Sequence, residues 1–430
     1  MKKIIEFLSL KKNIAVLLSV VLFVELGERM GERFLPLYII ALGGGSIAIG
    51  LLNALDNFLS AVYSIPGGYL SDKFGYKKSL IFFNILASLG YLIVIIFPYW
   101  QAAIIGAIFF ISWSAISLPA IMSVISASNP INKRTMGVSL HSITRRIPMA
   151  LGPILGGACL SIWGEVIGIR VAFSIAFILS VISIFMQVNM IEAPKVPDKL
   201  KFRFNPLKMF KLINPTLKNL LISDILIKFC TQIPYAFVVV WCVKYIQIGT
   251  FQFGILTAIE MITAILIYIP VAYLVEKSGK RAMASENSYE GRLRASKKKY
   301  VIISFIFFSI FPLFLLFSTS FSWLIAAFIV RGLKEFGEPT RKSLILDLSP
   351  NDNQAMAYGT YYFIRDIVVS VAALGGGFLW LLSPKMTLII ASGFGFLGTL
   401  YFIFYVNLSA RMEDDETPPE EPSTEKPKPA

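Results

Sequence analysis

Long apolar blocks alternate with short polar connections along the whole chain. The clearest blocks, 14–24, 79–97, 301–317 and 386–406, are almost free of charged residues. A helix of about 20 apolar residues crosses the roughly 30 Å hydrocarbon core of a bilayer. Only helices and closed barrels satisfy all their backbone hydrogen bonds there. The pattern therefore predicts an all-α membrane protein with about twelve transmembrane helices.

The expected spans form two sets of six. The first set comprises 13–41, 47–66, 79–97, 101–126, 136–162 and 166–190. The second set comprises 216–246, 251–274, 300–318, 321–347, 356–382 and 385–408. A connection rich in lysine and proline separates the sets, and an acidic, proline-rich stretch follows the last span. We therefore expect an N-terminal six-helix bundle over 1–191, a cytoplasmic linker over 192–215, a C-terminal six-helix bundle over 216–410 and a disordered tail over 411–430.

The distribution of basic residues predicts the orientation of the spans in the membrane. The net charge of +14 would suggest nucleic acid as a partner in a soluble protein, but the lysines and arginines gather in alternate connections, at 2–12, 73–78, 133–134, 195–218 and 277–299. The positive-inside rule assigns such connections to the cytoplasm, together with both termini. We therefore expect a multi-pass protein of the plasma (inner) membrane, in contact with the lipid bilayer and without a nucleic-acid partner.

The two halves share an ordered set of matching residues. Segment 65–75 resembles segment 269–279 at a shift of 204 residues, which also pairs Gly50 with Gly254 and Asp56 with Glu260. Further along, a shift of 220 residues pairs Arg145 with Arg365 and Gly156-Gly157 with Gly376-Gly377. A parallel six-span repeat is typical of transporters that rock two halves about a site near the bilayer midplane.

Segment 68–78, Gly-Tyr-Leu-Ser-Asp-Lys-Phe-Gly-Tyr-Lys-Lys, resembles the signature loop between helices two and three of the major facilitator superfamily. The resemblance implies that superfamily's fold, with helices one, four, seven and ten around a central cavity. It also implies a cytoplasmic gate in which the loop acid caps a neighbouring helix, where a carboxylate gains from the helix dipole. The expected gate residues are Gly68, Asp72, Lys73, Gly75, Lys77, Lys78 and Glu276.

Segment 152–157, Gly-Pro-Ile-Leu-Gly-Gly, resembles the end of the superfamily's antiporter motif, which favours proton-coupled export. The upstream glycines of that motif are replaced by Ser139 and Pro148. Small residues let transmembrane helices approach closely, so we expect a helix-packing role for Gly152, Pro153, Gly156 and Gly157.

Charged residues inside the spans are the candidate functional groups, because each costs about 2.5–3.5 kcal/mol at the centre of a membrane helix on insertion scales. Spans one and ten each carry a stripe with spacing i, i+3, i+4 and i+7, which places its members on one helix face. The stripes are Glu25, Glu28, Arg29 and Glu32, with Arg33 beside them, and Arg331, Lys334, Glu335 and Glu338. Two such stripes are expected to face a polar interior.

Other spans contribute Asp56, Arg145, Arg146, Glu260, Arg365 and Asp366. The candidate substrate and proton-coupling residues are Glu25, Glu28, Arg29, Glu32, Asp56, Arg145, Glu260, Arg331, Lys334, Glu335, Glu338, Arg365 and Asp366. The alternative is purely structural pairing. The expected i,i+4 pairs are Glu25–Arg29, Arg331–Glu335, Lys334–Glu338 and Asp224–Lys228. Three charges near span ends are expected to be solvated: Lys244, Arg341 and Lys342.

Asp56 and Glu260 occupy equivalent repeat positions, so they either bind the solute or proton or have a shared structural role. The same two alternatives hold for Arg145 and Arg365. Residues that break the repeat are better placed to contact an asymmetric solute. His141, the single histidine, is either a packing residue or a proton relay one turn before Arg145.

These features predict a secondary transporter that moves a small polar or charged solute by alternating access, coupled to protons, with export favoured over import. No Walker-type phosphate loop occurs in the sequence, so we expect no ATP drive. Sodium coupling and uncoupled diffusion stay open. Glu25, Glu28 and Arg29 resemble the first-helix signature of proton-coupled oligopeptide transporters, but that match ends at Met30.

The remaining alternatives are a nutrient importer and a non-transporting membrane sensor. We expect no enzyme, because one histidine and three scattered cysteines supply no nucleophile–base or metal constellation. We expect no cofactor and no metal, and a monomer whose partners are the solute and protons.

Overall fold

The computed structural model describes residues 12–111, 134–190, 215–283, 289–349 and 354–406, together with Trp113, Ser117 and Ile121. Within these residues the secondary structure is helical, without strands. Eight helical segments of the described part are long and apolar enough to cross a membrane. The predicted all-α membrane fold is confirmed.

Six helices precede the linker: α2 (Lys12–Glu32), α3 (Leu35–Ala41), α4 (Ser46–Phe74), α5 (Tyr76–Ile96), α6 (Trp100–Phe110) and α8 (Arg134–Met190). The first expected span breaks between α2 and α3, where Pro36 begins the next helix. The long α8 contains two spans, because Gly164 has a φ of +74° and turns the chain between them. This turn falls between the expected spans 136–162 and 166–190.

In the described residues, ten helical segments follow the linker: α10 (Pro215–Gln232), α11 (Phe237–Val240), η2 (Trp241–Tyr245), α12 (Thr250–Met283), α13 (Tyr289–Phe317), α14 (Phe321–Leu333), η3 (Lys334–Gly337), α15 (Glu338–Asp347), α16 (Gln354–Leu382) and α17 (Pro384–Tyr405). The seventh expected span is broken beside Pro234, and the tenth changes to 3-10 geometry over Lys334–Gly337 before Pro339. Tyr235, in the first break, and Lys334, in the second, line the same pocket.

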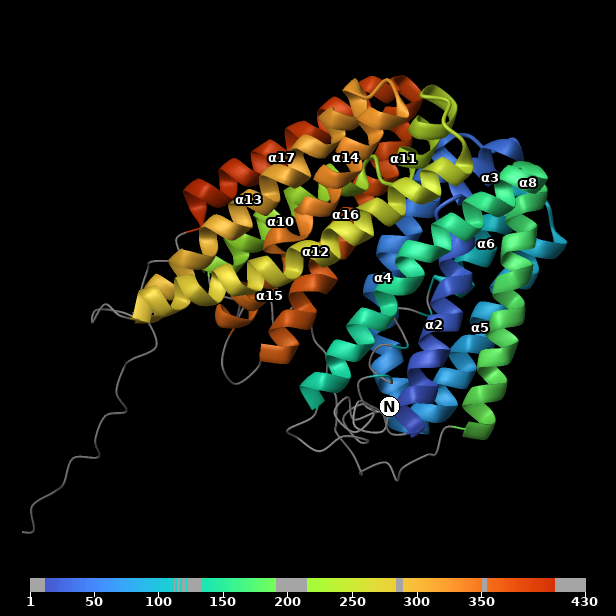
Figure 1. Ribbon diagram of the computed structural model, residues 1–430, viewed down its shortest axis with the longest axis horizontal. Coiled ribbons are helices and arrows are strands. Elements are labelled where there is room, and N and C mark those ends of the chain that lie inside the picture. The colour runs from blue at the N-terminus through green and yellow to red at the C-terminus, as the bar shows by residue number, and fades with distance from the viewer. Residues whose placement is uncertain are drawn as a thin grey trace, which may run out of the picture.

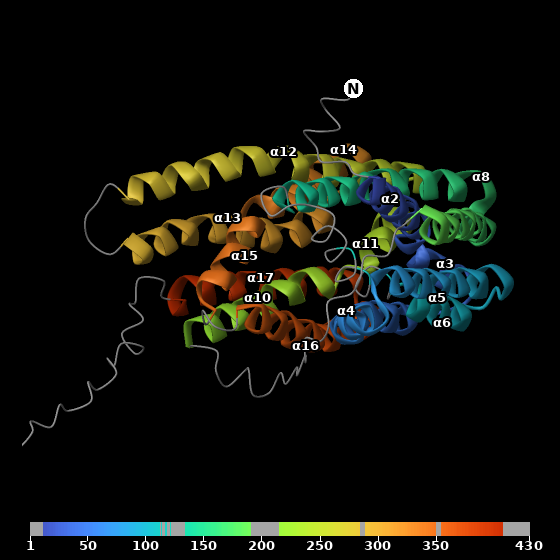
Figure 2. The same ribbon diagram turned by 90° about the horizontal axis from the view of Figure 1, so that it is seen from below.

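Helices α2–α8 form one group and helices α10–α17 another (Figure 1). We call these groups the N-terminal half and the C-terminal half. The halves meet at the end that carries the connection from α3 to α4 and the start of α12, and they diverge toward the opposite end, where α2 begins (Figure 1). Two helix pairs join the halves, α4 with α16 and α8 with α12, and the view from below shows each pair side by side (Figure 2).

Glycines make both junctions between the halves possible. A Cβ atom on Gly50 would lie 2.8 Å from the Cα of Gly377, and one on Gly254 would lie 2.8 Å from the Cα of Ile154. Gly157 faces Gly254's helix in return, and its carbonyl accepts a hydrogen bond of 3.0 Å from the Thr250 hydroxyl. Because the repeat pairs Gly50 with Gly254 and Gly157 with Gly377, the two junctions are equivalent contacts.

Large apolar side chains cover the outside of the helices. Phe185, Leu266 and Leu382 are 67%, 68% and 82% exposed. Inside the N-terminal half, Tyr91, Phe110 and Phe173 pack ring against ring with centroids 5.2–5.8 Å apart. Apolar surface on this scale is not left to water, and a lipid environment accounts for it. The chain is a multi-pass membrane protein.

Candidate functional site

Glu25 on α2 pairs across the N-terminal half with Arg145 on α8. The Arg145 Nε donates to Glu25 Oε1 at 2.6 Å, and the Glu25 side chain is 2% exposed. The expected local partner, Arg29, instead binds Glu32 at 2.5 Å. The i,i+4 prediction for Glu25 and Arg29 is therefore wrong, because α8 packs along α2 and offers a guanidinium at closer range.

Glu28 differs from the other acids of the α2 stripe. It is 3% exposed, and its Oε2 has no hydrogen-bond partner. In the described part of the chain no ion pair within 4 Å reaches it. The Tyr91 hydroxyl, which also lacks a hydrogen-bond partner, lies within electrostatic reach of Glu28. Glu28 is thus a buried carboxyl group without an ion pair or hydrogen bond among the described residues, and the cation within its electrostatic reach, Arg29, is bound to Glu32.

Tyr235 lies between an arginine from each half. The Arg33 guanidinium lies 4.8 Å from the Tyr235 ring centroid, and that of Arg331 lies 5.9 Å from it. The ring belongs to the turn between α10 and α11, which the break beside Pro234 creates. Cation–π attraction holds both guanidinium groups near the centre of the molecule.

Glu260 on α12 is a paired acid. Arg331 Nε lies 3.2 Å from its Oε1 and Lys334 Nζ lies 2.9 Å from the same atom. Arg331 and Lys334 of span ten thus both bind an acid of another helix, and Glu338, the i,i+4 partner predicted for Lys334, binds Arg341 and Lys342. Asp56, at the equivalent repeat position, has no ion pair or hydrogen bond in the described part of the chain. The repeat-related acids are thus in opposite electrostatic situations.

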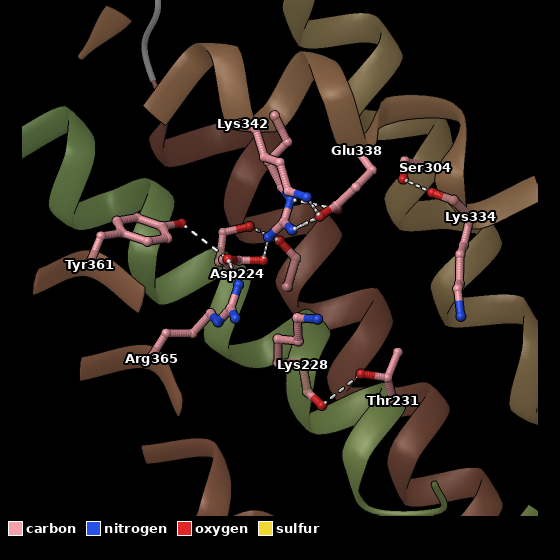
Figure 3. A network of polar contacts seen from close by, with 12 residues as sticks. Asp224, Lys228, Thr231, Ser304, Lys334, Glu338, Lys342, Tyr361 and Arg365 are labelled. Atoms are coloured by element: carbon pink, nitrogen blue, oxygen red, sulfur yellow. Dashed lines mark hydrogen bonds and ion pairs between the residues drawn. The ribbon is translucent and has the colours of Figure 1, made fainter. Parts of the chain in front are cut away.

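Asp224 on α10 is the centre of a buried network in the C-terminal half (Figure 3). It accepts hydrogen bonds from Arg341, from Arg365 at 3.4 Å and from the Tyr361 hydroxyl at 3.2 Å. Arg341 also binds Glu338 at 2.6 Å, and Arg365 binds Asp366 at 2.7 Å.

Two predictions fail at this network. Arg341 was expected to be solvated, yet its side chain is only 3% exposed, because Asp224 compensates its burial. Asp224 was expected to pair with Lys228 one turn away, but the two arginines from α15 and α16 take both its oxygens. Lys342, 49% exposed, and Lys244, 40% exposed, do lie at the surface.

Among the described residues, two ion pairs join the halves. Arg146 lies 3.9 Å from Glu335 near the centre, and Lys244 lies 2.6 Å from Glu165 at the end where the halves meet. Beside them, the Asn53 side-chain amide of α4 donates to the Gln232 carbonyl of α10 at 2.6 Å. These contacts and the Thr250–Gly157 hydrogen bond must break for the halves to separate.

Two pockets lie among these charges. The first, which we call the N-side pocket, encloses about 520 Å³, and its polar lining includes Glu32, Arg33, Asn53, Asp56, Tyr235 and Arg331. The second, the C-side pocket, encloses about 710 Å³, and its polar lining includes Lys228, Thr231, Gln232, Tyr235, Arg331, Lys334, Glu335 and Glu338. Tyr235 and Arg331 belong to both linings, so the two pockets are neighbours.

The gate residues are described only in part. Gly75, with a φ of +80°, separates α4 from α5, and the Lys77 ammonium donates to the Val188 carbonyl at 2.7 Å. Lys73 and Lys78 are exposed. The side chains of Asp72, Glu276 and His141 lie outside the described residues, as do the linker and the tail; Gly68 lies within α4.

Three glycines of the 152–157 segment lie in close helix contacts. Gly152 meets the Arg29 side chain, Gly156 meets the Met30 carbonyl of the same half, and Gly157 faces α12 of the other half. Gly376 likewise meets the Ile233 carbonyl within the C-terminal half. Each glycine doublet therefore serves one contact inside its half and one between halves.

Sequence reasoning missed Tyr235, Asn53 and Gln232, since polar uncharged residues inside spans are common. The one available signal was Pro234, which interrupts span seven next to all the Tyr235 contacts.

The architecture and the central charged site define a class, the membrane transporters built from two six-helix halves. A family model described as Major Facilitator Superfamily matches residues 17–285 and 291–430. The chain belongs to the Major Facilitator Superfamily.

Its similarities to individual proteins are more distant. It is 25% identical to the uncharacterized MFS-type transporter MJ1317 of Methanocaldococcus jannaschii, over 92% of this chain and 95% of that protein. A mutant of the peptide transporter POT has a TM-score of 0.74 at 13% identity, covering 92% of this chain and 93% of that one. A mutant of the nucleoside transporter NupG has a TM-score of 0.73 at 14% identity, with coverages of 91% and 99%. These structural likenesses show the fold.

Proposed function

We propose that this protein is a secondary active transporter in which a small polar or charged solute binds between the halves, at the N-side and C-side pockets, and crosses the membrane by alternating access. The observation that carries the proposal is the concentration of buried charges at the break points of spans seven and ten. Charges inside a membrane protein are costly and face a bundle interior or a water-filled cavity.

The proposed state is inward-facing. The halves meet at the end that bears Glu165, Lys244 and the glycine junctions, and they diverge toward the end that bears the basic connections (Figure 1). The positive-inside rule assigns the diverging end to the cytoplasm. In this proposal, 1–191 and 216–410 are the two rocking bodies, and the membrane is the plasma (inner) membrane.

Proton coupling is proposed at Glu28. A carboxylate buried without a partner costs several kcal/mol, whereas the protonated carboxyl group is neutral. Rocking of the halves would change the access of water to α2, so Glu28 would bind a proton on one side and release it on the other. The ion pairs of Glu25 and Glu32 leave these acids less suited to the task.

The test uses purified protein in proteoliposomes with an imposed pH gradient or sodium gradient and a panel of charged and zwitterionic solutes. The native protein is expected to accumulate one solute against its gradient when the pH gradient is present. Glu28→Gln is expected to lose this accumulation at least tenfold and to keep solute counterflow, which needs no net proton movement.

Asp347→Asn is the matched control, since this acid is 32% exposed, pairs with Lys297 inside the C-terminal half and should leave coupling unchanged. Accumulation by Glu28→Gln equal to the native level would overturn the assignment of Glu28. Accumulation driven by sodium alone would overturn proton coupling. Absence of any flux would overturn the transport proposal.

A further inference from the structure

Most charges that line the two pockets are balanced by a partner. Glu32 is bound by Arg29 at 2.5 Å, and Arg331 and Lys334 share Glu260. Glu338 is bound by Arg341 at 2.6 Å, and Glu335 faces Arg146 at 3.9 Å. Arg33 has no ion pair in the described part of the chain, and the Tyr235 ring is its contact. Two charged side chains of the linings have neither an ion pair, a hydrogen bond nor a ring contact among the described residues, one in each pocket.

Asp56 is the acid of the N-side pocket without an ion pair or hydrogen bond in the described part of the chain. The guanidinium groups within its electrostatic reach are those of Arg29, which binds Glu32, and Arg33, which lies over the Tyr235 ring. The repeat equivalent of Asp56, Glu260, is bound by two cations of span ten, Arg331 and Lys334. At the shift of 220 residues that relates spans four and ten, Arg331 corresponds to Ile111 and Lys334 to Ser114. Ile111 itself lines the N-side pocket. Asp56 thus lacks a partner because span four carries an isoleucine where span ten carries an arginine.

Lys228 is the unbalanced charge of the C-side pocket. The dashed contact drawn at this residue runs from the Thr231 hydroxyl to its backbone oxygen (Figure 3). No ion pair or hydrogen bond of its ammonium group occurs in the described part of the chain. The acids within its electrostatic reach, Asp224 and Glu338, are already occupied by Arg341 and Arg365.

The two sides of the site therefore present opposite unbalanced charges, an acid on the N-terminal half and a base on the C-terminal half. A solute with one charge would leave the other pocket uncompensated, and a buried charge without a partner is strongly unfavourable. A solute with both charges would balance both pockets at once. Tyr235, which lines both, lies where the body of such a solute would pass.

We propose that the solute is a zwitterion whose cationic group binds Asp56 in the N-side pocket and whose anionic group binds Lys228 in the C-side pocket. This inference rests on the proposed transport function and specifies its solute class and orientation. An ammonium group and a carboxylate or phosphate group are the chemistries that these two residues would bind.

The test measures binding to the purified full-length protein. The probes are alanine, alanyl-alanine and alanyl-alanyl-alanine, each as the free zwitterion, as the C-terminal amide and as the N-acetyl derivative. The three lengths place the two charged groups at different separations, to match the distance between Asp56 and Lys228. At least one zwitterion is expected to bind ten times or more tightly than its amide, which lacks the anion, and its N-acetyl form, which lacks the cation.

Two substitutions assign the subsites. Asp56→Asn is expected to bind the zwitterion and the N-acetyl form equally, and Lys228→Gln is expected to bind the zwitterion and the amide equally. Ile111→Arg, which supplies the cation that span four lacks, is expected to act like Asp56→Asn although Asp56 is intact. Lys342→Gln, at an exposed lysine of the same half, is the control and should keep the native discrimination.

The amide or the N-acetyl form binding as tightly as the zwitterion would overturn the proposal, as would unchanged discrimination in Asp56→Asn or Lys228→Gln. Binding by none of the nine probes would overturn it for amino-acid-like zwitterions. A solute of a single charge found in the flux assay would also overturn it while the transport proposal stands, so the two failures are distinguishable.

Discussion

At the scale of single residues, burial is tolerated where charges are shared among several partners. Asp224 is fully buried, yet Arg341, Arg365 and Tyr361 together satisfy both its oxygens. Arg341 in turn bridges Asp224 and Glu338. Removing one member of such a network leaves an uncompensated charge in an apolar interior, and the cost of that is about 3–5 kcal/mol.

Arg341→Met should therefore lower the free energy of unfolding by about 3–5 kcal/mol, whereas Lys342→Met should change it by less than about 1 kcal/mol. Arg341 and Lys342 are adjacent in the sequence, but the Arg341 side chain is buried, whereas that of Lys342 is 49% exposed and lies 3.5 Å from Glu338. Denaturant-induced unfolding of both variants in one detergent provides the measurement. Equal stabilities for the two variants would contradict the network's structural role.

At the scale of helices, the limits of the spans were predictable and the choice of charge partners was not. Hydropathy acts locally, so the turn at Gly164 falls between the expected spans 136–162 and 166–190, whereas the break beside Pro234 lies inside the expected span 216–246 and was not predicted. Which charged residues pair depends on the rotation of each helix about its axis and on its axial position relative to the neighbouring helices. Asp224 thus bonds to Arg341, 117 residues away, in preference to Lys228 on the next turn.

The glycine junctions give a prediction for helix α16. A Cβ on Gly377 would lie 2.8 Å from the Ser46 carbonyl oxygen of α4, whereas one on Gly375 would meet nothing within 4 Å. Gly377→Ala should disfavour the closed junction by about 1–3 kcal/mol, the usual cost of overpacking. That cost corresponds to a population shift of about 5–150-fold toward the state that is open at this end.

The measurement is the labelling rate, from outside intact cells, of a cysteine introduced at Leu52, which lines the N-side pocket. The three native cysteines, all buried, are replaced beforehand. Gly377→Ala should speed labelling, and Gly375→Ala should match the parent protein. Equal rates in the two variants would show that the junction does not limit access.

At the scale of the whole molecule, the two halves are joined at one end and apart at the other, and this asymmetry gives the protein a direction. The junction end has Gly249 in its connection, and the diverging end has the exposed Lys78. The fold class could be derived from hydropathy and from the repeat. The orientation in the membrane rests on the distribution of basic residues.

A cysteine introduced at Gly249 should react with a membrane-impermeant thiol reagent in intact cells. A cysteine at Lys78 should react only after the cells are permeabilised. A fluorescent protein fused after Ala430 should fluoresce from the cytoplasmic side. Labelling of the Lys78 position in intact cells would reverse the assigned topology and, with it, the inward-facing assignment of this structure.

The difference between Asp56 and Glu260 has a consequence for the origin of the molecule. A duplicated ancestor with two identical halves would have possessed a twofold-symmetric site, at which the two ends of a solute are indistinguishable. In this protein Arg331 and Lys334 bind Glu260, whereas Asp56 has no such cations, so the two ends of a solute meet different surroundings. Two positions on one helix suffice for the change, so polarity toward the solute could arise by point substitution without any rearrangement of the fold.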